Sequence, residues 1–200
     1  MRPVYRPEAT RIRDGVAGNA RLTGGMAVVL LVLLAAEGAT IPFIGPLLQP
    51  HILIGMLLIP PVVLKLGSTG YRFVRYYAGS PAYVRKGPPP LFLRLLAPGV
   101  VLTTVALFGT GVALLLAGPP GNTLVLAHKI SFVAWVALMT LHVLGHLLEA
   151  PHLALADWRR AGPREAQLAG AGTRISALAA SILAGVAVAL LSVSAAGSWP

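Results

Sequence analysis

Histidine is the residue type in this sequence most able to do chemistry, because its imidazole can bind a metal or move a proton near neutral pH. There are five histidines: His51, His128, His142, His146 and His152. Four of the five lie in or at the ends of long apolar stretches. Polar side chains are rare inside membranes and mark functional sites there. Fourteen residues separate His128 from His142, which on a helix is about four full turns and roughly 21 Å along the axis. One helix is therefore expected to present an imidazole near each of its ends, on nearly the same face.

A weak internal repeat relates these histidines to a second helix. Each half of the repeat has an apolar helix with a glycine-containing section, a short uncharged turn, and a further apolar helix that opens with a histidine. Aligning His51 with His128 places Lys65 opposite His142. Because both histidine-bearing helices would run in the same direction, His51 and His128 are expected at similar depth. Two imidazoles at one level on neighbouring helices are the ligand pair that a six-coordinate haem b requires.

This pattern resembles the bacterial membrane cytochromes b, the four- or five-helix haem subunits of hydrogenases and formate dehydrogenases. The segments that carry the resemblance are LHVLGHL, with His142 and His146, and AHKISFVAW, with His128. The resemblance implies one haem b, or two, with His51 and His128 as iron ligands and His142 as a further cofactor-binding residue. Lys65 stands where a ligand opposite His142 would be expected, so either the second haem is lost or His142 or His146 has another partner.

Two charged residues in or beside the apolar stretches, Lys129 and Glu37, have two interpretations each. Lys129 follows His128 directly and either neutralises haem propionates or extends to lipid headgroups. Glu37 lies about eleven residues into the first stretch, where an ionised carboxylate costs about 2.5–3.5 kcal/mol, so we expect it to be neutral or paired. It is either a structural ion-pair partner of Lys65 or a proton-handling acid near a haem or a quinone.

Other functions are compatible with the same residues. His142 and His146, four residues apart, resemble half of a metal site that Glu149 or His152 would have to complete. A haem-free accessory, scaffold or transporter-like membrane protein, using the Glu37–Lys65 pair, is the main alternative. There is no nucleophile–base pair, and the absence of cysteine excludes disulfides, c-type haem attachment and iron–sulfur clusters. If the protein takes part in an enzyme, it is at most the electron-transfer subunit of an oxidoreductase.

The composition identifies the solvent of these helices as lipid. Of the 200 residues, 56% are hydrophobic and 11% are charged, against about 25% charged in a soluble domain. The mean hydropathy is +0.78. A membrane helix needs roughly 20 apolar residues. We therefore predict an all-α integral membrane protein, a five-helix bundle of two repeated hairpins and a C-terminal helix, with spans at about 25–46, 51–77, 95–117, 124–148 and 175–195.

The charged residues predict the orientation of these spans. Fifteen of the sixteen lysines and arginines fall on one side: five before residue 25, six between residues 65 and 94, and four between residues 159 and 174. The positive-inside rule makes that side cytoplasmic. Residues 1–24 are then a basic cytoplasmic segment, retained with the first span as an anchor, and residues 25–200 form one transmembrane domain in the plasma membrane with its C-terminus outside. Topology and anionic lipids account for the net charge of +10, so no nucleic-acid partner is expected. Electrons would pass between a quinone pool and a partner oxidoreductase subunit.

Overall fold

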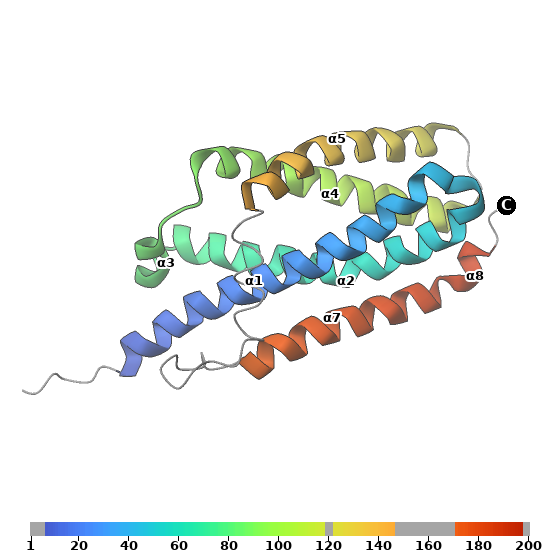
Figure 1. The fold of residues 1–200 in the computed structure, drawn as a ribbon. Coiled ribbons are helices and arrows are strands. Elements are labelled where there is room, and N and C mark those ends of the chain that lie inside the picture. The colour runs from blue at the N-terminus through green and yellow to red at the C-terminus, as the bar shows by residue number, and fades with distance from the viewer. Residues whose placement is uncertain (1–6, 119–121, 147–170, 198–200) are drawn as a thin grey trace, which may run out of the picture.

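A computed structural model describes residues 7–118, 122–146 and 171–197, and all regular structure within these ranges is helical (Figure 1). In chain order the elements are α1 (Pro7–Thr40), the 3₁₀-helix η1 (Ile41–Phe43), α2 (Ile44–Tyr77), α3 (Pro81–Lys86), α4 (Leu91–Ala117), α5 (Asn122–His146), α7 (Ala171–Leu191) and α8 (Val193–Ala196). The predicted all-α class is confirmed for these ranges.

Four segments are long and apolar enough to cross a membrane: 15–77, Leu91–Ala117, Thr123–His146 and Ala171–Leu191. The first is continuous through η1, where the chain reverses direction (Figure 1). Large apolar side chains point outwards along the helices, with Leu95 73%, Leu116 79% and Leu191 82% exposed. Such a surface suits lipid rather than water. The structure therefore supports a membrane protein, while the count of five crossings and the internal repeat remain predictions.

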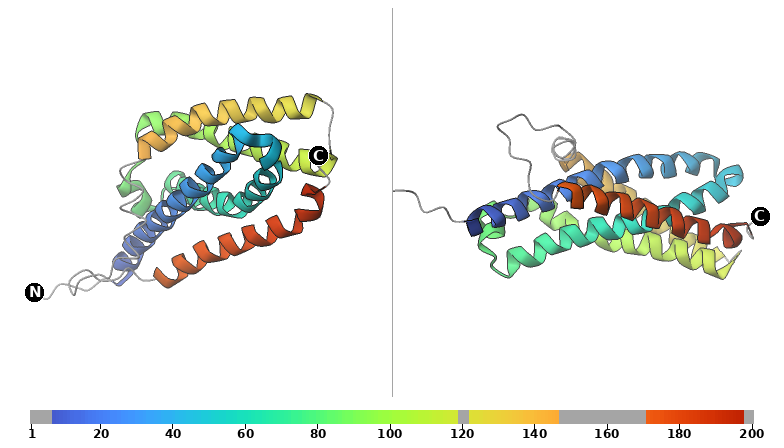
Figure 2. Two further views of the ribbon diagram at one scale, coloured as in Figure 1. Left: turned by 45° about the vertical axis from the view of Figure 1, so that its right-hand side comes forward. Right: turned by 90° about the horizontal axis from the view of Figure 1, so that it is seen from below.

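The long helices lie side by side in three layers (Figures 1 and 2). Helices α4 and α5 form one layer, α1 and α2 the middle, and α7 the layer on the opposite side. Helix α2 is central, because it packs against α1, α4 and α7. We call the end of the bundle that holds η1, α8 and the start of α5 the η1 end, and the end that holds α3 the α3 end.

The first helical hairpin differs in its bounds from the prediction. Helix α1 ends at Thr40 and α2 begins at Ile44, whereas the sequence suggested an end near residue 46 and a start at His51. The turn is hidden in the hydropathy pattern because its residues are themselves apolar. A kink at Leu47 (φ −106°, ψ 17°) follows, shortly before Pro50. Glu37 therefore lies one turn from the end of α1, not near the middle of a membrane span. The other long helices agree with their predicted spans to within about a turn at each described end.

Close backbone packing joins α7 to α2. Proline lacks the N–H that would bond the carbonyl four residues earlier, so Pro61 leaves the Leu57 carbonyl without its helical partner. Gly185 of α7 packs directly on that carbonyl, and a methyl group at Gly185 would overlap it. Met26 and Leu58 are fully buried beside this contact region and form the centre of the apolar core. The absence of a side chain at Gly185 thus lets two helices approach at the point where a proline has freed an acceptor.

Candidate functional site

The structure brings His51 and His128 together at the η1 end. His51 is in the second turn of α2 and His128 in the second turn of α5, and both side chains are half-buried. Their ring centres are 6.4 Å apart and the ring planes are inclined by 83°. The two residues that the repeat placed at similar depth are therefore neighbours in space.

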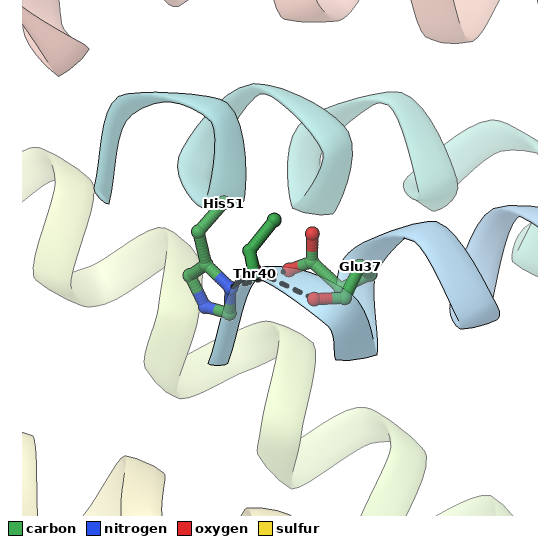
Figure 3. A network of polar contacts seen from close by, with 3 residues as sticks. All are labelled: Glu37, Thr40 and His51. Atoms are coloured by element: carbon green, nitrogen blue, oxygen red, sulfur yellow. Dashed lines mark hydrogen bonds and ion pairs between the residues drawn. The ribbon is translucent and has the colours of Figure 1, made fainter. Parts of the chain in front are cut away.

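The Nδ1 atom of His51 is held by two residues at the end of α1 (Figure 3). It lies 3.0 Å from Glu37 Oε1 and 3.0 Å from Thr40 Oγ1. The Thr40 hydroxyl donates its own hydrogen to the Glu37 carbonyl oxygen at 2.6 Å, so toward His51 it acts as an acceptor. The hydrogen between them must then belong to His51 Nδ1. This selects the tautomer in which Nε2 carries the free lone pair.

His128 has the same arrangement with a different supporting residue. Its Nδ1 lies 3.0 Å from Thr110 Oγ1 on α4. The Thr110 hydroxyl donates to the carbonyl oxygens of Ala106 at 2.7 Å and Leu107 at 3.0 Å, so it too accepts from the imidazole. No group in the described part of the chain forms a hydrogen bond with Nε2 of either histidine. Both rings are thus oriented through Nδ1 and leave Nε2 available.

This donor set fits a metal held between two imidazoles. Metal-binding histidines usually donate the N–H of their other nitrogen to a carboxylate, carbonyl or hydroxyl, which fixes the tautomer and the ring. Metal–imidazole bonds of about 2.0–2.1 Å place the two ring centres roughly 6 Å apart, since each centre lies about 1.1 Å beyond its nitrogen. The observed 6.4 Å agrees with that separation. The residue types and the distance between the ring centres of His51 and His128 are therefore compatible with two imidazoles that share one metal ion.

Glycines provide room at both supporting positions. A Cβ atom at Gly111 would lie 3.3 Å from Cε1 of the His128 ring, closer than ordinary van der Waals contact. A Cβ atom at Gly55 would lie 3.4 Å from Glu37 Oε1, at the lower limit of ordinary van der Waals contact. Lys129, next to His128, is exposed, which suits either of its predicted roles. Glycine thus stands where the ring of His128 and the carboxyl of Glu37 approach a neighbouring helix.

The predicted Glu37–Lys65 ion pair is not formed. Glu37 contacts His51, whereas Lys65 Nζ donates to the Thr23 carbonyl oxygen of α1 at 2.8 Å. Lys65 belongs to a polar cluster nearer the α3 end, in which Thr23 Oγ1 lies 3.0 Å from Ser68 Oγ and Asn19 Nδ2 donates to the Ser68 carbonyl oxygen. The backbone carbonyl of Thr23 replaces the carboxylate that the sequence suggested. This cluster joins α1 to α2.

His142 and His146 lie away from the paired histidines. Their ring centres are 4.9 Å apart, and Nδ1 of His142 is buried and has no hydrogen-bond partner among the described residues. His142 lies within electrostatic range of Lys65, the residue that the sequence alignment placed opposite it. The described residues contain no group of three or more potential metal ligands. Glu149 and His152, which the alternative metal site would need, lie outside the described residues.

Thr40 and Thr110 are the site residues that sequence reasoning missed. Each orients one histidine, yet threonine in a helix commonly bonds a carbonyl of its own preceding turn, and both do so here. One signal for them was available in the sequence. Each threonine is a hydroxyl-bearing residue in an apolar part of the helix that comes before a histidine-bearing helix. For Thr110 the flanking glycines strengthened that signal.

Comparison with known proteins does not identify a family: no family model, curated protein or solved structure matches this chain. The resemblance to membrane cytochromes b thus depends on the sequence pattern alone. The geometry around His51 and His128 is the independent basis for a functional proposal.

Proposed function

We propose that this protein is a small membrane cytochrome b-like protein that binds haem b between His51 and His128 and transfers electrons. The observation that carries the proposal is the matched pair of imidazoles. Both have Nδ1 engaged by a neighbouring helix, both have Nε2 free, and their centres are 6.4 Å apart. Two histidines that only filled space would not need the same tautomer.

The chain's own residues would prepare this site before any cofactor arrives. Thr40 and Thr110 hold the two rings in one tautomer, so little rotational freedom is lost when Nε2 binds a metal. The apolar helices around the η1 end would limit the access of water to a bound cofactor, which influences its redox potential. Haem b, when bound, supplies one-electron redox chemistry. Lys129, which follows His128 in the sequence and is exposed, would balance the negative charge of a propionate.

The proposed electron path follows from the depth and topology predicted for the site. The basic connection between α2 and α4 includes α3, so the positive-inside rule would put the α3 end in the cytoplasm and make the η1 end face outwards across the plasma membrane. Electrons would pass between a membrane quinone pool and a partner oxidoreductase subunit. The proposal assigns one haem, and it leaves His142, the further candidate from the sequence, without a cofactor.

Haem content tests the proposal. The protein would be produced with added haem precursor, purified in detergent, and measured by the pyridine haemochromogen assay together with four variants: His51→Ala, His128→Ala, the double variant, and His142→Ala as the matched control. We expect one haem b per chain in the wild type and in the control, and a large loss in the other three. A colourless wild-type preparation would refute the haem function and favour the haem-free accessory role.

A further inference from the structure

The two candidate ligands differ in what holds their Nδ1 atoms. For His128, the hydroxyl of Thr110 is the one side-chain group in the described residues that contacts Nδ1, at 3.0 Å. For His51, two side-chain groups contact Nδ1, each at 3.0 Å: the hydroxyl of Thr40 and a carboxyl oxygen of Glu37. Glu37 is the only acidic residue between residues 15 and 146. The one carboxyl in this long apolar region therefore lies against one of the two imidazoles.

Glu37 is fixed in this position by its surroundings. Its side chain is 15% exposed, and Gly55 of α2 leaves just enough space for the Oε1 atom that faces His51. The other carboxyl oxygen, Oε2, is buried and has no hydrogen-bond partner in the part of the chain that the structure describes. Lys65, which could have neutralised it, donates instead to Thr23 in the cluster nearer the α3 end. The interaction with His51 is thus the one polar contact of the Glu37 carboxyl group in the described residues.

A carboxyl group in this place changes the properties of the imidazole. When an acceptor draws on the N–H of a metal-bound imidazole, the opposite nitrogen becomes a stronger electron donor. A stronger axial donor stabilises ferric over ferrous iron, and such hydrogen bonds are one of the means by which proteins set haem potentials. When it is ionised, a carboxyl oxygen is a stronger acceptor than a hydroxyl oxygen. His51 is therefore expected to be the more electron-donating ligand of the pair.

From these contacts we propose that Glu37 is a positioning residue that acts through Nδ1 of His51 to lower the reduction potential of the haem. This inference rests on the proposed function, since it requires haem to be bound by His51 and His128. A purely structural Glu37 would affect stability or haem retention, but it would leave the potential of the bound haem unchanged.

Redox titration of the haem-loaded protein tests the inference directly. Glu37→Gln keeps the size of the side chain and replaces the carboxyl oxygen by a weaker acceptor. Thr110→Val, which removes the hydroxyl acceptor of the other ligand, is the matched control. We expect Glu37→Gln to raise the midpoint potential by at least a tenfold change in the ferric–ferrous equilibrium, which is about 59 mV for one electron. Thr110→Val should produce a smaller change.

A second measurement leaves Glu37 intact. In His51→Gly, the missing ring is replaced by free imidazole, whose N–H can be accepted by Glu37, or by 1-methylimidazole, which has no N–H. The same pair of ligands is added to His128→Gly as the control. We expect imidazole to give a lower potential than 1-methylimidazole, with a larger difference in His51→Gly than in His128→Gly.

The possible outcomes separate this inference from the proposed function. If the wild type binds one haem and Glu37→Gln has the same midpoint potential as the wild type, the proposed role of Glu37 is overturned, while the haem site stands. If Glu37→Gln does not retain haem, equal potentials with the two free ligands in His51→Gly would overturn it instead. A wild-type protein that binds no haem would overturn the function and the inference with it.

Discussion

Gly111→Leu is the perturbation that addresses the geometry of the site most sharply without touching a ligand. Gly111 is on α4, one residue after Thr110, and faces the His128 ring. A single Cβ atom there would already lie 3.3 Å from Cε1 and 3.8 Å from Nδ1 of that ring. Leucine adds three further carbon atoms beyond Cβ, so the ring and the side chain cannot both keep their places.

The expected magnitude follows from the cost of overpacking. Extra methyl or methylene groups in a packed region typically cost about 1–3 kcal/mol. Without a cofactor, the His128 ring can rotate away and relieve the overlap. In the proposed haem-bound state the ring would be held by the iron and by Thr110, so the bound state would bear the cost. At about 1.4 kcal/mol per tenfold change, haem affinity should fall by roughly 5- to 150-fold.

Gly109→Leu is the matched control, because Gly109 is exposed on the same helix and a Cβ atom there would meet nothing within 4 Å. Haem affinity would be measured by titrating the haem-free proteins in detergent and following the Soret band. Gly109→Leu should bind as the wild type does. Equal affinities for the Gly111→Leu and Gly109→Leu proteins would refute the reasoning, because the observed place of the His128 ring would then have no part in binding.

Two further predictions concern the packing that supports the site, measured as free energies of unfolding by titration with a denaturing detergent. Gly185→Ala should destabilise the protein by about 1–3 kcal/mol, because the new methyl group overlaps the Leu57 carbonyl oxygen. Gly67→Ala is the control: it adds a methyl group in open space and should be neutral or stabilising. Similar values for both variants would contradict the close α2–α7 contact. Trp135→Phe should cost about 1 kcal/mol, since it removes the 3.0 Å hydrogen bond from the indole N–H to Thr104, and an unchanged stability would show that this bond contributes nothing.

The positions of most helices could be predicted from hydropathy, but the first turn could not. Residues 41–48 contain no charge and are mainly apolar, so the pattern continues through the place where the chain reverses. The turn depends on η1 and on the kink at Leu47. The prediction therefore placed Glu37 too deep in its helix. Its true place, one turn before the end of α1, is what brings it to His51.

The pairing of His51 with His128 could be predicted, whereas their supporting contacts could not. The repeat placed both histidines at one level, since depth follows from counting residues along helices. Which atoms meet depends on helix rotation and on backbone groups that a sequence pattern does not specify. For this reason Lys65 was assigned a carboxylate partner but donates to the carbonyl oxygen of Thr23. For the same reason the contacts of Thr40 and Thr110 with the two histidines could not be predicted from the sequence.

Axial ligation is the most direct test of the account, and electron paramagnetic resonance of the oxidised, purified protein measures it. Two imidazole ligands make ferric haem low-spin, so the wild type should give a low-spin signal. His51→Ala and His128→Ala should each lose haem or show a high-spin signal, while His142→Ala should remain low-spin. A high-spin wild type, a wild type without haem, or a low-spin signal that survives the loss of His128 would contradict the assignment of His51 and His128 as the haem ligands.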